Sequence, residues 1–425
     1  MAYSTIVGSF NIDPTKLATE TQAITGLGFQ PKIVLFWWGG STGTIDTVAG
    51  GTINVGFGAA TSSTSRSCIN IISEDAQASS DTYKFQDTDQ IMRAYTDTGT
   101  LDGLLDFSSM DADGFTVVYD DQFTQAYRIS YLALGGTDLT NVYIGSQQQP
   151  ASTGNYSVTG VGFQPDAVLF FYTRGSTADV GSDHGYVGLG MATGSSNQGV
   201  SNIGTVDGQA TTLTSGYGYN GECMSTAVPP TGVGEREAFV SLDADGFTNN
   251  CLEVTSRSFY YFVALKGGQY SVGDITTRTD GNDIAETVGF TPVALLFASA
   301  NRALSTQNAS TAHARISIGA GTSTSNRACA AISDENNLAD SETAYANYDS
   351  AVYANVADDA IVGLMDIKSI DASGFTCVMD DFDPVACWVT YLAIGAVVAA
   401  GQPMNARGVR VPGMRQWQPG RGPGF

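Results

Sequence analysis

Short apolar runs separated by clusters of Gly, Ser, Thr, Asp and Asn dominate the chain, and this pattern predicts β-strands. In the first third of the chain the predicted strands are residues 4–10, 32–38, 52–60, 68–74, 91–95, 101–108, 115–120 and 127–134. Sustained helical periodicity is missing, and only residues 82–97 could accommodate a helical turn. The spacing of the strands is typical of a β-sandwich or barrel.

One of these runs, Ile33–Trp38, has no polar alternation. Pro31 precedes it, and a proline belongs at the start of a strand because it cannot donate a ladder hydrogen bond. A strand that is apolar on both faces must be covered on both faces. We therefore expect this run to be the central strand of a packed sandwich.

The same phrases recur three times in the same order. GFQPKIVLFWW begins at Gly28, GFQPDAVLFFY at Gly162 and GFTPVALLFAS at Gly289, at intervals of 134 and 127 residues. A second phrase, DADGF or DASGF, recurs with its glycine at positions 114, 246 and 374. This order and period indicate a triplicated domain.

We therefore predict an all-β fold of three tandem, homologous, jelly-roll-like β-sandwiches, arranged as beads or as a compact pseudo-threefold cluster. Each repeat has about 130 residues, which is long enough to bury its own core. The predicted segments are repeats at 1–136, 137–268 and 269–398, followed by an extended C-terminal arm at 399–425.

Composition agrees with a turn-rich β protein. The 425 residues include 50 Gly, 42% are hydrophobic and only 14% are charged. The net charge of −23 opposes binding to nucleic acid or to anionic membranes. Apolar runs fall short of the roughly 20 residues that a membrane span needs. No basic and apolar leader precedes MAYSTIVGSF, so we expect synthesis in the cytoplasm without a signal peptide.

The six cysteines form no CxxC pair and no repeated framework. Most of them lie within predicted strands. We expect buried free thiols rather than disulfides or a zinc site.

Clustered aspartates give one candidate for metal binding. Hard cations such as calcium prefer carboxylate oxygens. The plainer interpretation of the DADG phrase is a turn, in which Asp accepts backbone N–H groups and Gly takes a positive φ before Phe enters the core. The weak calcium candidates are Asp111, Asp113, Asp120, Asp121, Asp380 and Asp381.

Neither the histidines nor the glycine-rich phrases predict catalysis. His184 and His313 occupy equivalent positions, where the first repeat has Thr52, and no GxSxG elbow lies nearby. We therefore expect a structural role for both. The glycines of VGFGAAT resemble a phosphate-binding loop, but no helix follows them. A glycoside hydrolase is a remote alternative, because no acid pair in apolar surroundings is evident.

Several aromatic residues near predicted strand ends could stack on sugars, although core packing is the plainer expectation. These are Trp37, Trp38, Phe171, Tyr172, Tyr217 and Tyr219. The segment between Leu213 and Glu237 is the most distinctive insertion of the second repeat. If one loop recognises a ligand, we expect it to be this one, with Tyr217 and Tyr219.

The chain changes character from Gly401 onward, where it has four Arg, four Pro and no acidic residue. Such a segment cannot form a core and is typical of an extended arm. We expect it to bind a neighbouring subunit or another acidic protein, with Trp417 as its anchor. The expected ion-pair partners are Arg407, Arg410, Arg415 and Arg421.

The phrases TGVGFQPDAVLFF, SLDADGFT and YLALGG resemble the repeated β-sandwich modules of virion proteins from tailed bacteriophages and related archaeal viruses. Such modules occur in tail-fibre, capsid-decoration and host-attachment proteins. The resemblance covers residues 1–398 and carries no catalytic residue over. It implies a non-enzymatic structural role on the virion exterior, which a protein without a leader reaches when the host cell lyses.

We therefore expect a virion surface protein without a cofactor, calcium being the one open possibility. It would form a homo-oligomer, with a trimer as first choice, and attach to other virion proteins through its arm. The alternative is an adhesin that binds a host surface glycan. No contact with nucleic acid and no membrane insertion are expected.

Overall fold

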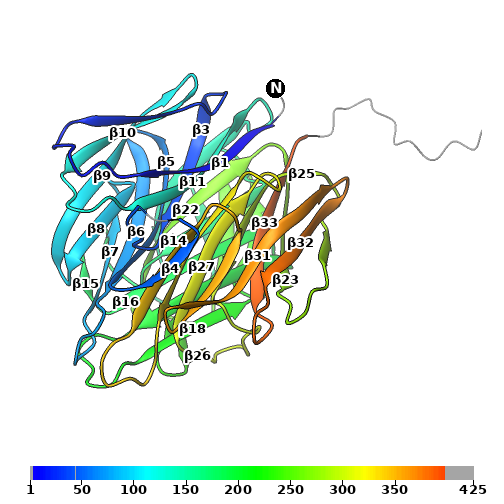
Figure 1. Ribbon diagram of the computed structural model, residues 1–425. Helices are drawn as coiled ribbons and strands as arrows, with labels where there is room; N and C mark the ends of the chain where they lie inside the picture. Colours follow the sequence, from blue (N-terminus) through cyan, green and yellow to red (C-terminus); the bar gives the residue numbers. More distant parts are fainter. Residues whose placement is uncertain (1–2, 44, 398–425) are drawn as a thin grey trace, which may run out of the picture.

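The computed structural model describes residues 3–43 and 45–397. Strands account for 62% of the chain, and the described residues contain no helix, so the predicted all-β fold is confirmed. The strands form three sheets of seven strands and three sheets of four strands (Figure 1).

The first repeat supplies six strands of one large sheet and all four strands of a small one. In spatial order, the large sheet contains β1 (Tyr3–Asn11), β11 (Arg128–Gly136), β3 (Pro31–Trp38), β5 (Ile53–Ser62), β6 (Ser65–Ser73) and β7 (Thr82–Asp87). The small sheet contains β2 (Thr21–Thr25), β10 (Gly114–Asp121), β9 (Thr100–Asp111) and β8 (Met92–Asp97). All pairings are antiparallel.

The second repeat reproduces this order. Its large sheet contains β12 (Asn141–Gln148), β22 (Phe259–Lys266), β14 (Ala167–Tyr172), β16 (Gly185–Gly194), β17 (Asn197–Thr205) and β18 (Thr214–Tyr219). Its small sheet contains β13 (Gly154–Thr159), β21 (Gly246–Cys251), β20 (Gly232–Asp243) and β19 (Met224–Val228).

The third repeat has the same order again. Its large sheet contains β23 (Gln269–Thr276), β33 (Trp388–Gly395), β25 (Pro292–Ser299), β27 (Ala314–Gly321), β28 (Arg327–Asp334) and β29 (Thr343–Tyr348). Its small sheet contains β24 (Ile284–Thr287), β32 (Gly374–Asp381), β31 (Ala360–Asp371) and β30 (Tyr353–Ala357).

Each large sheet is covered on both faces, as the unbroken apolar run in β3 predicts. Phe36 and Trp38 point toward the small sheet and pack in a core that includes Phe115 of β10. Leu35 and Trp37 point the other way, into a second core. Because both faces are buried, a strand without polar alternation is stable here.

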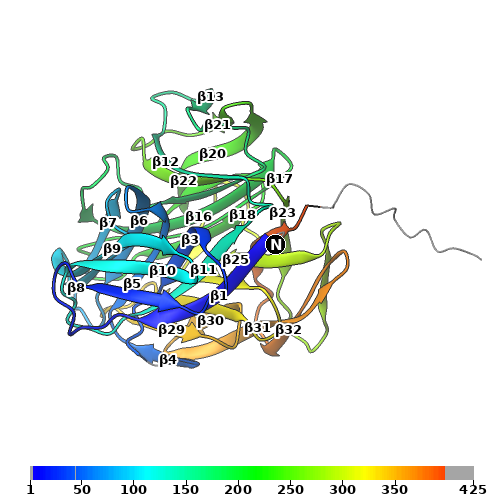
Figure 2. The ribbon, with the colours of Figure 1, turned by 90° about the horizontal axis from the view of Figure 1, so that it is seen from above.

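This second core is shared by all three repeats and lies at the centre of the molecule. The ring of Phe57 lies 5.3 Å from that of Phe171, so the first and second repeats are in direct contact. Seen from above, the three thirds of the chain surround a common centre (Figure 2). Other members of the core are Ile33, Leu169, Val263, Leu296 and Ile318. The repeats are therefore a compact cluster rather than separate beads.

Three short strands link the repeats in a closed cycle. After its central strand, each repeat sends a loop to the outer edge of another repeat's large sheet. β4 (Thr47–Gly50) pairs with β29, β15 (Ser182–Asp183) pairs with β7, and β26 (Thr311–Ala312) pairs with β18. Apart from these three crossing strands, the sheets respect the predicted repeat boundaries.

The structure bears on two local predictions, the possible helical turn at residues 82–97 and the state of the six cysteines. Residues 82–97, which could accommodate a helical turn on sequence alone, form β7 and β8, and the burial of β7 alternates with the period of a strand. The helical alternative is therefore wrong. All six cysteines are buried and free, as predicted.

Candidate functional site

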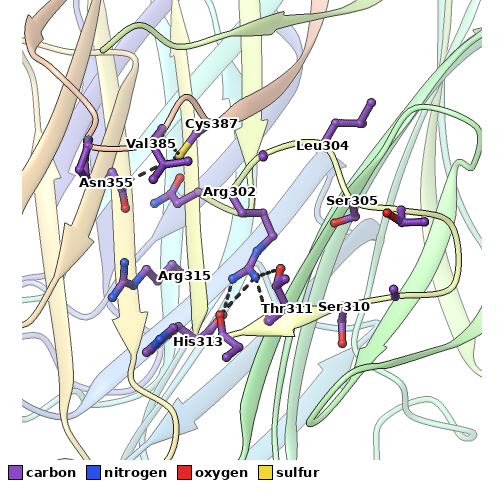
Figure 3. A pocket seen from close by; sticks show the side chains of 16 residues that line it. Arg302, Leu304, Ser305, Ser310, Thr311, His313, Arg315, Asn355, Val385 and Cys387 are labelled. Atoms are coloured by element: carbon purple, nitrogen blue, oxygen red, sulfur yellow. Dashed lines mark hydrogen bonds between the residues drawn. The ribbon is translucent and has the colours of Figure 1, made fainter.

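The crossing loop of the third repeat, residues 300–313, forms the wall of a pocket. Arg302 holds this loop in place from just beyond the end of β25. Its guanidinium donates hydrogen bonds to the carbonyls of Ala300 at 3.1 Å and Thr311 at 2.8 Å, and also to the carbonyl of His313 (Figure 3). These bonds turn the backbone carbonyls toward the cation and fix the course of the loop.

The far side of the loop is fastened to the second repeat. Ser305 N–H donates to the Gly218 carbonyl at 2.9 Å, and Ser310 N–H donates to the Thr231 carbonyl at 3.1 Å. The pocket that results has a volume of about 410 Å³. This volume lies within the range of small-molecule sites.

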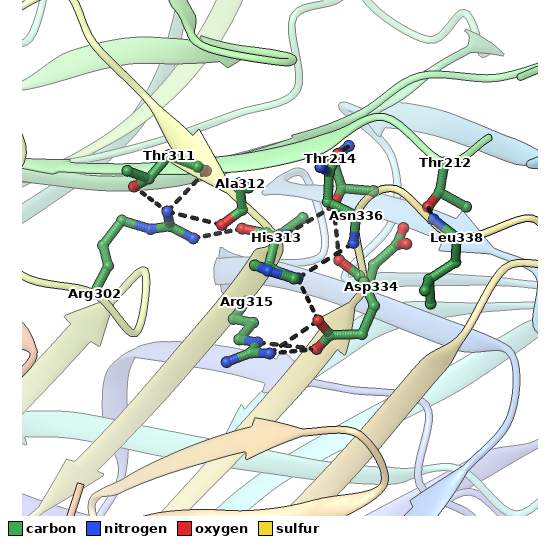
Figure 4. Close-up of polar contacts among 12 residues, drawn as sticks. Thr212, Thr214, Arg302, Thr311, Ala312, His313, Arg315, Asp334, Asn336 and Leu338 are labelled. Atoms are coloured by element: carbon green, nitrogen blue, oxygen red, sulfur yellow. Dashed lines mark hydrogen bonds and ion pairs between the residues drawn. The ribbon is translucent and has the colours of Figure 1, made fainter. Parts of the chain in front are cut away.

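Next to the pocket, the Glu335 carboxylate contacts both Arg315 and His313. Arg315 donates to the Glu335 carboxylate through Nε at 3.0 Å and through Nη2 at 2.7 Å, and His313 Nδ1 contacts the same carboxylate (Figure 4). Burial acts to raise the pKa of Glu335, but the contacts with His313 and Arg315 outweigh it and hold the pKa below its usual value. The carboxylate is therefore charged at neutral pH.

The pocket also contains a thiol, Cys387, which donates to the Val385 carbonyl at 3.3 Å. Burial raises the pKa of this thiol to about 12. Since the thiolate is the nucleophilic form, Cys387 is unreactive at neutral pH.

A second polar site lies where the three large sheets meet. The last residues of β6, β17 and β28 are equivalent, and they are Ser73, Thr205 and Asp334. Ser73 Oγ donates to Asp334 Oδ2 at 2.8 Å. Burial raises the pKa of Asp334 to about 7, although the Ser73 and Thr205 hydroxyls act to lower it. This carboxyl group titrates near neutral pH inside the protein.

Sequence reasoning missed a buried carboxylate in the second repeat. Glu237 accepts a hydrogen bond from Asn249 Nδ2 at 2.8 Å and another from Tyr156 Oη. Burial raises its pKa to about 7. Glu237 is a single buried carboxylate, whereas the hydrolase alternative needs a pair of acidic groups. Glu237 has no exposed surface, so a polysaccharide cannot reach it without a conformational change.

The DADG aspartates serve the turn between β9 and β10, as the plainer interpretation predicts. Asp113 accepts the N–H groups of Gly28 at 2.6 Å and Gly26 at 3.2 Å. Asp111 accepts the hydroxyls of Ser109 at 2.7 Å and Thr116 at 2.6 Å. Protein donors therefore occupy the oxygens that a cation would need.

The other calcium candidates lie at the ends of β10 and β32. Asp120 accepts a hydrogen bond from Gln90 at 2.9 Å, and Asp121 accepts the N–H of Gln122 at 2.9 Å. The equivalent residues in the third repeat are Asp380 and Asp381, both exposed. Within the described part of the chain, no group of three or more His, Cys, Asp or Glu is arranged to hold a metal ion.

The expected ligand loop of the second repeat is not a loop. Residues 214–219 form β18, and residues 224–228 form β19. Tyr217 is fully buried in the sandwich core, and Tyr219 packs against that core. Tyr217 therefore follows the plainer expectation of core packing and cannot face a ligand, whereas Tyr219 keeps a partly exposed ring. The other aromatic candidates are also buried: Trp37, Trp38, Phe171 and Tyr172.

The two histidines have the equivalent positions that their sequence context predicts. Both have a positive φ, 69° at His184 and 71° at His313, directly before β16 and β27. His184 Nδ1 accepts the N–H of Asp207 at 2.9 Å. A structural role at the return of the crossing loop accounts for both.

The predicted arm residues Arg407, Arg410, Arg415, Trp417 and Arg421 lie outside the described residues. In the range from residue 3 to residue 397 that the structure covers, no helix has the length and apolar character that a membrane span requires. Comparison with known family models and with curated proteins finds no match for this chain.

Proposed function

We propose that this protein is a non-enzymatic structural protein on the exterior of a virion, where it packs against copies of itself and against other virion proteins. The observation that carries the proposal is the closed cycle of crossing strands around one shared core. Such a chain is equivalent to a closed trimer in one polypeptide. A rigid block of this kind, with a small sheet on each of its three outer sides, suits repetitive packing.

The sequence supports the same proposal. The repeated phrases resemble those of virion modules, and the chain has only five lysines among its 425 residues. The basic arm has the opposite charge sign to the acidic body and supplies the attachment to neighbours. Because the shared core already covers the inner faces of the large sheets, association between copies uses the outer surfaces and the arm.

Incorporation into particles tests this proposal. Particles assembled with the full chain should contain it in a fixed copy number after gradient purification. A chain ending at Val397 should fold with the same circular dichroism spectrum but be absent from the particles. A matched variant with Gln at all four arm arginines separates the contribution of charge from that of Trp417. Absence of the full chain from purified particles would overturn the proposal.

A second candidate function, a glycan-binding adhesin for host attachment, is favoured by the pocket in the third repeat. Glycan-array binding by the purified chain is the expected result. Cleavage of a polysaccharide by the same preparation would instead revive the hydrolase alternative.

A further inference from the structure

The pocket of the third repeat differs in its lining residues from the same place in the other repeats. The sheet register aligns Arg302 with Ser41 of the first repeat and Gly175 of the second. The second repeat does have a nearby arginine, Arg174, but Glu235 neutralises it at 2.7 Å. At the crossing loop of the second repeat, the Lys84 ammonium of β7 takes the place of the Arg302 guanidinium and donates to the carbonyls of Asp183 at 2.7 Å and His184 at 3.2 Å.

The position of Arg315 shows the same divergence. The register aligns it with Asn54 of the first repeat and Tyr186 of the second. The first repeat has a hollow of about 330 Å³ in the corresponding place, and none of the residues around it is charged. This scaffold position therefore carries a different side chain in each repeat.

The lining of the pocket is electrostatically unusual for this molecule. It includes Arg302, Arg315 and His313 but no acidic residue. The whole chain, in contrast, has 42 acidic and 19 basic residues. Arg315 is paired with Glu335, so Arg302 supplies the unpaired positive charge, which attracts a small anion to a concave site of an acidic protein.

Arg302 itself is bonded in a way that leaves its charge uncompensated. Its hydrogen-bond partners are backbone carbonyls and the Thr311 hydroxyl, which are neutral. Arg315, by contrast, is paired with Glu335. Burial, with a smaller effect from Arg315, lowers the pKa of Arg302 to about 10. The guanidinium stays charged at neutral pH, and a bound anion would stabilise it.

The rest of the lining matches a small polyhydroxy molecule. Four residues with hydroxyl groups line the pocket, and these are Ser305, Thr306, Ser310 and Thr311. Ser305 Oγ also accepts the Gly218 N–H at 3.2 Å, and Ser310 Oγ also donates to Ser215 Oγ at 3.2 Å. Leu304 and Val385 add an apolar edge, with 46% and 63% of their surfaces exposed. Hydroxyl groups suit the polar edges of a sugar ring, and the apolar edge suits its C–H face.

We infer that the pocket formed by the crossing loop of the third repeat binds a compact acidic sugar, whose carboxylate is drawn to the cationic wall at Arg302. The inference rests on the second proposed function, glycan recognition, and is independent of a virion location.

Calorimetric titration of the full chain tests the ligand class. The probes are D-glucuronate, D-galacturonate and N-acetylneuraminate, with D-glucose and D-galactose as neutral counterparts. We expect each uronate to bind at least about tenfold more tightly than its neutral counterpart. Sulfate and phosphate serve as inorganic anions, and binding of either as tightly as the uronates would overturn the sugar assignment.

A pair of charge variants at one rim residue locates the site. Leu304→Asp should weaken uronate binding at least about tenfold, because like charges repel, and Leu304→Lys should leave it equal or tighter. The matched control is Val180→Asp, in the equivalent crossing loop of the second repeat with 53% of its surface exposed, which should change nothing. Circular dichroism confirms that each variant is folded.

Three results would overturn the inference: no binding of any acidic sugar, equal binding of acidic and neutral sugars, or equal effects of the Leu304 and Val180 variants. Selective binding of neutral glycans would leave the adhesin proposal intact while refuting the acidic ligand. Failure of particle incorporation would refute only the structural proposal.

Discussion

At the scale of single residues, the glycines of the repeated VGFG, VGLG and ISIG phrases mark close contacts between the two sheets of a sandwich. A Cβ at Gly190 would lie 1.7 Å from the carbonyl oxygen of Cys223. The same contact in the other repeats joins Gly58 to Ile91 and Gly319 to Val352. The phrase that resembles a phosphate loop thus recurs because, in each repeat, a backbone carbonyl of the facing segment leaves no room for a Cβ at its final glycine.

Gly190→Ala should therefore lower the free energy of unfolding by about 2 kcal/mol or more, because a backbone carbonyl cannot easily move aside. Gly194→Ala, in the same strand β16, is the matched control, since nothing lies within 4 Å of its added Cβ. Urea unfolding measures both. Equal stabilities of the two variants would contradict the proposed contact.

Asp334 gives a prediction for pH. Its pKa is raised to about 7 in the folded state, so between the unfolded pKa of about 4 and pH 7 the folded protein binds the extra proton. The contribution of Asp334 to stability is therefore largest below about pH 4 and is lost as the pH rises toward 7.

Because asparagine does not titrate, the free energy of unfolding of Asp334→Asn should decrease less between about pH 5 and about pH 8 than that of the unmodified protein. Urea unfolding at the two pH values measures it, with Asp340→Asn, at an exposed position, as the control. Neighbouring acids that bear on Asp334, namely Glu335 and Asp75, are unchanged in both variants. An unaltered slope in Asp334→Asn would show that other groups set the pH dependence.

The turn residues were the most predictable. Gly114 and Gly246 have φ values of 149° and 137°, and each precedes a phenylalanine that is fully buried, Phe115 or Phe247. The DADG pattern identifies such a turn because only a few residue types satisfy its backbone. Tyr217 could not be placed in the same way, since the TSGYGY text of β18 gives no apolar period.

At the scale of elements, the long apolar strands were predictable and the crossing strands were not. Ile33–Trp38 has a composition that only a doubly covered strand explains, and β3 matches it. β15 and β26 have two residues each, and their partners lie in another repeat. No local pattern encodes such a pairing, and the pocket was missed for the same reason, because its wall is the loop that makes the crossing.

The crossing strand β4 offers a test of coupling between repeats. Ala49→Pro removes the Ala49 N–H from the middle of β4, opposite Tyr345 of β29. We expect a loss of about 2–4 kcal/mol and loss of hydrogen-exchange protection in β29, far along the chain. Ala49→Ser keeps the N–H and is the control. Protection of β29 that survives in Ala49→Pro would show that the crossing strand is dispensable.

At the scale of the whole molecule, the shared core and the closed cycle join three sandwiches into one unit. We expect a single unfolding transition, in which the calorimetric and van't Hoff enthalpies agree, because no repeat can leave without exposing the inner faces of the others. Scanning calorimetry of the full chain measures this. Three resolved transitions would mean that the repeats are stable separately.

The threefold plan also allows the crossing-loop site to differ from repeat to repeat. The three repeats keep the same strand order, while the residues at the crossing loops differ freely. Ser41, Gly175 and Arg302 occupy one position in this plan and have different chemistry. Internal duplication therefore lets each crossing loop carry its own side chains while the strand order is kept.

The pairing of β4 with β29 has a consequence for biosynthesis. The two strands are separated by about 290 residues, so the ribosome makes the donor long before its acceptor. At a translation rate of about 5–20 residues per second, β4 remains without its partner strand β29 for on the order of 15–60 s. The cycle of crossing strands therefore cannot close until the third repeat has been synthesised. Folding of the first repeat is completed only after translation of the third.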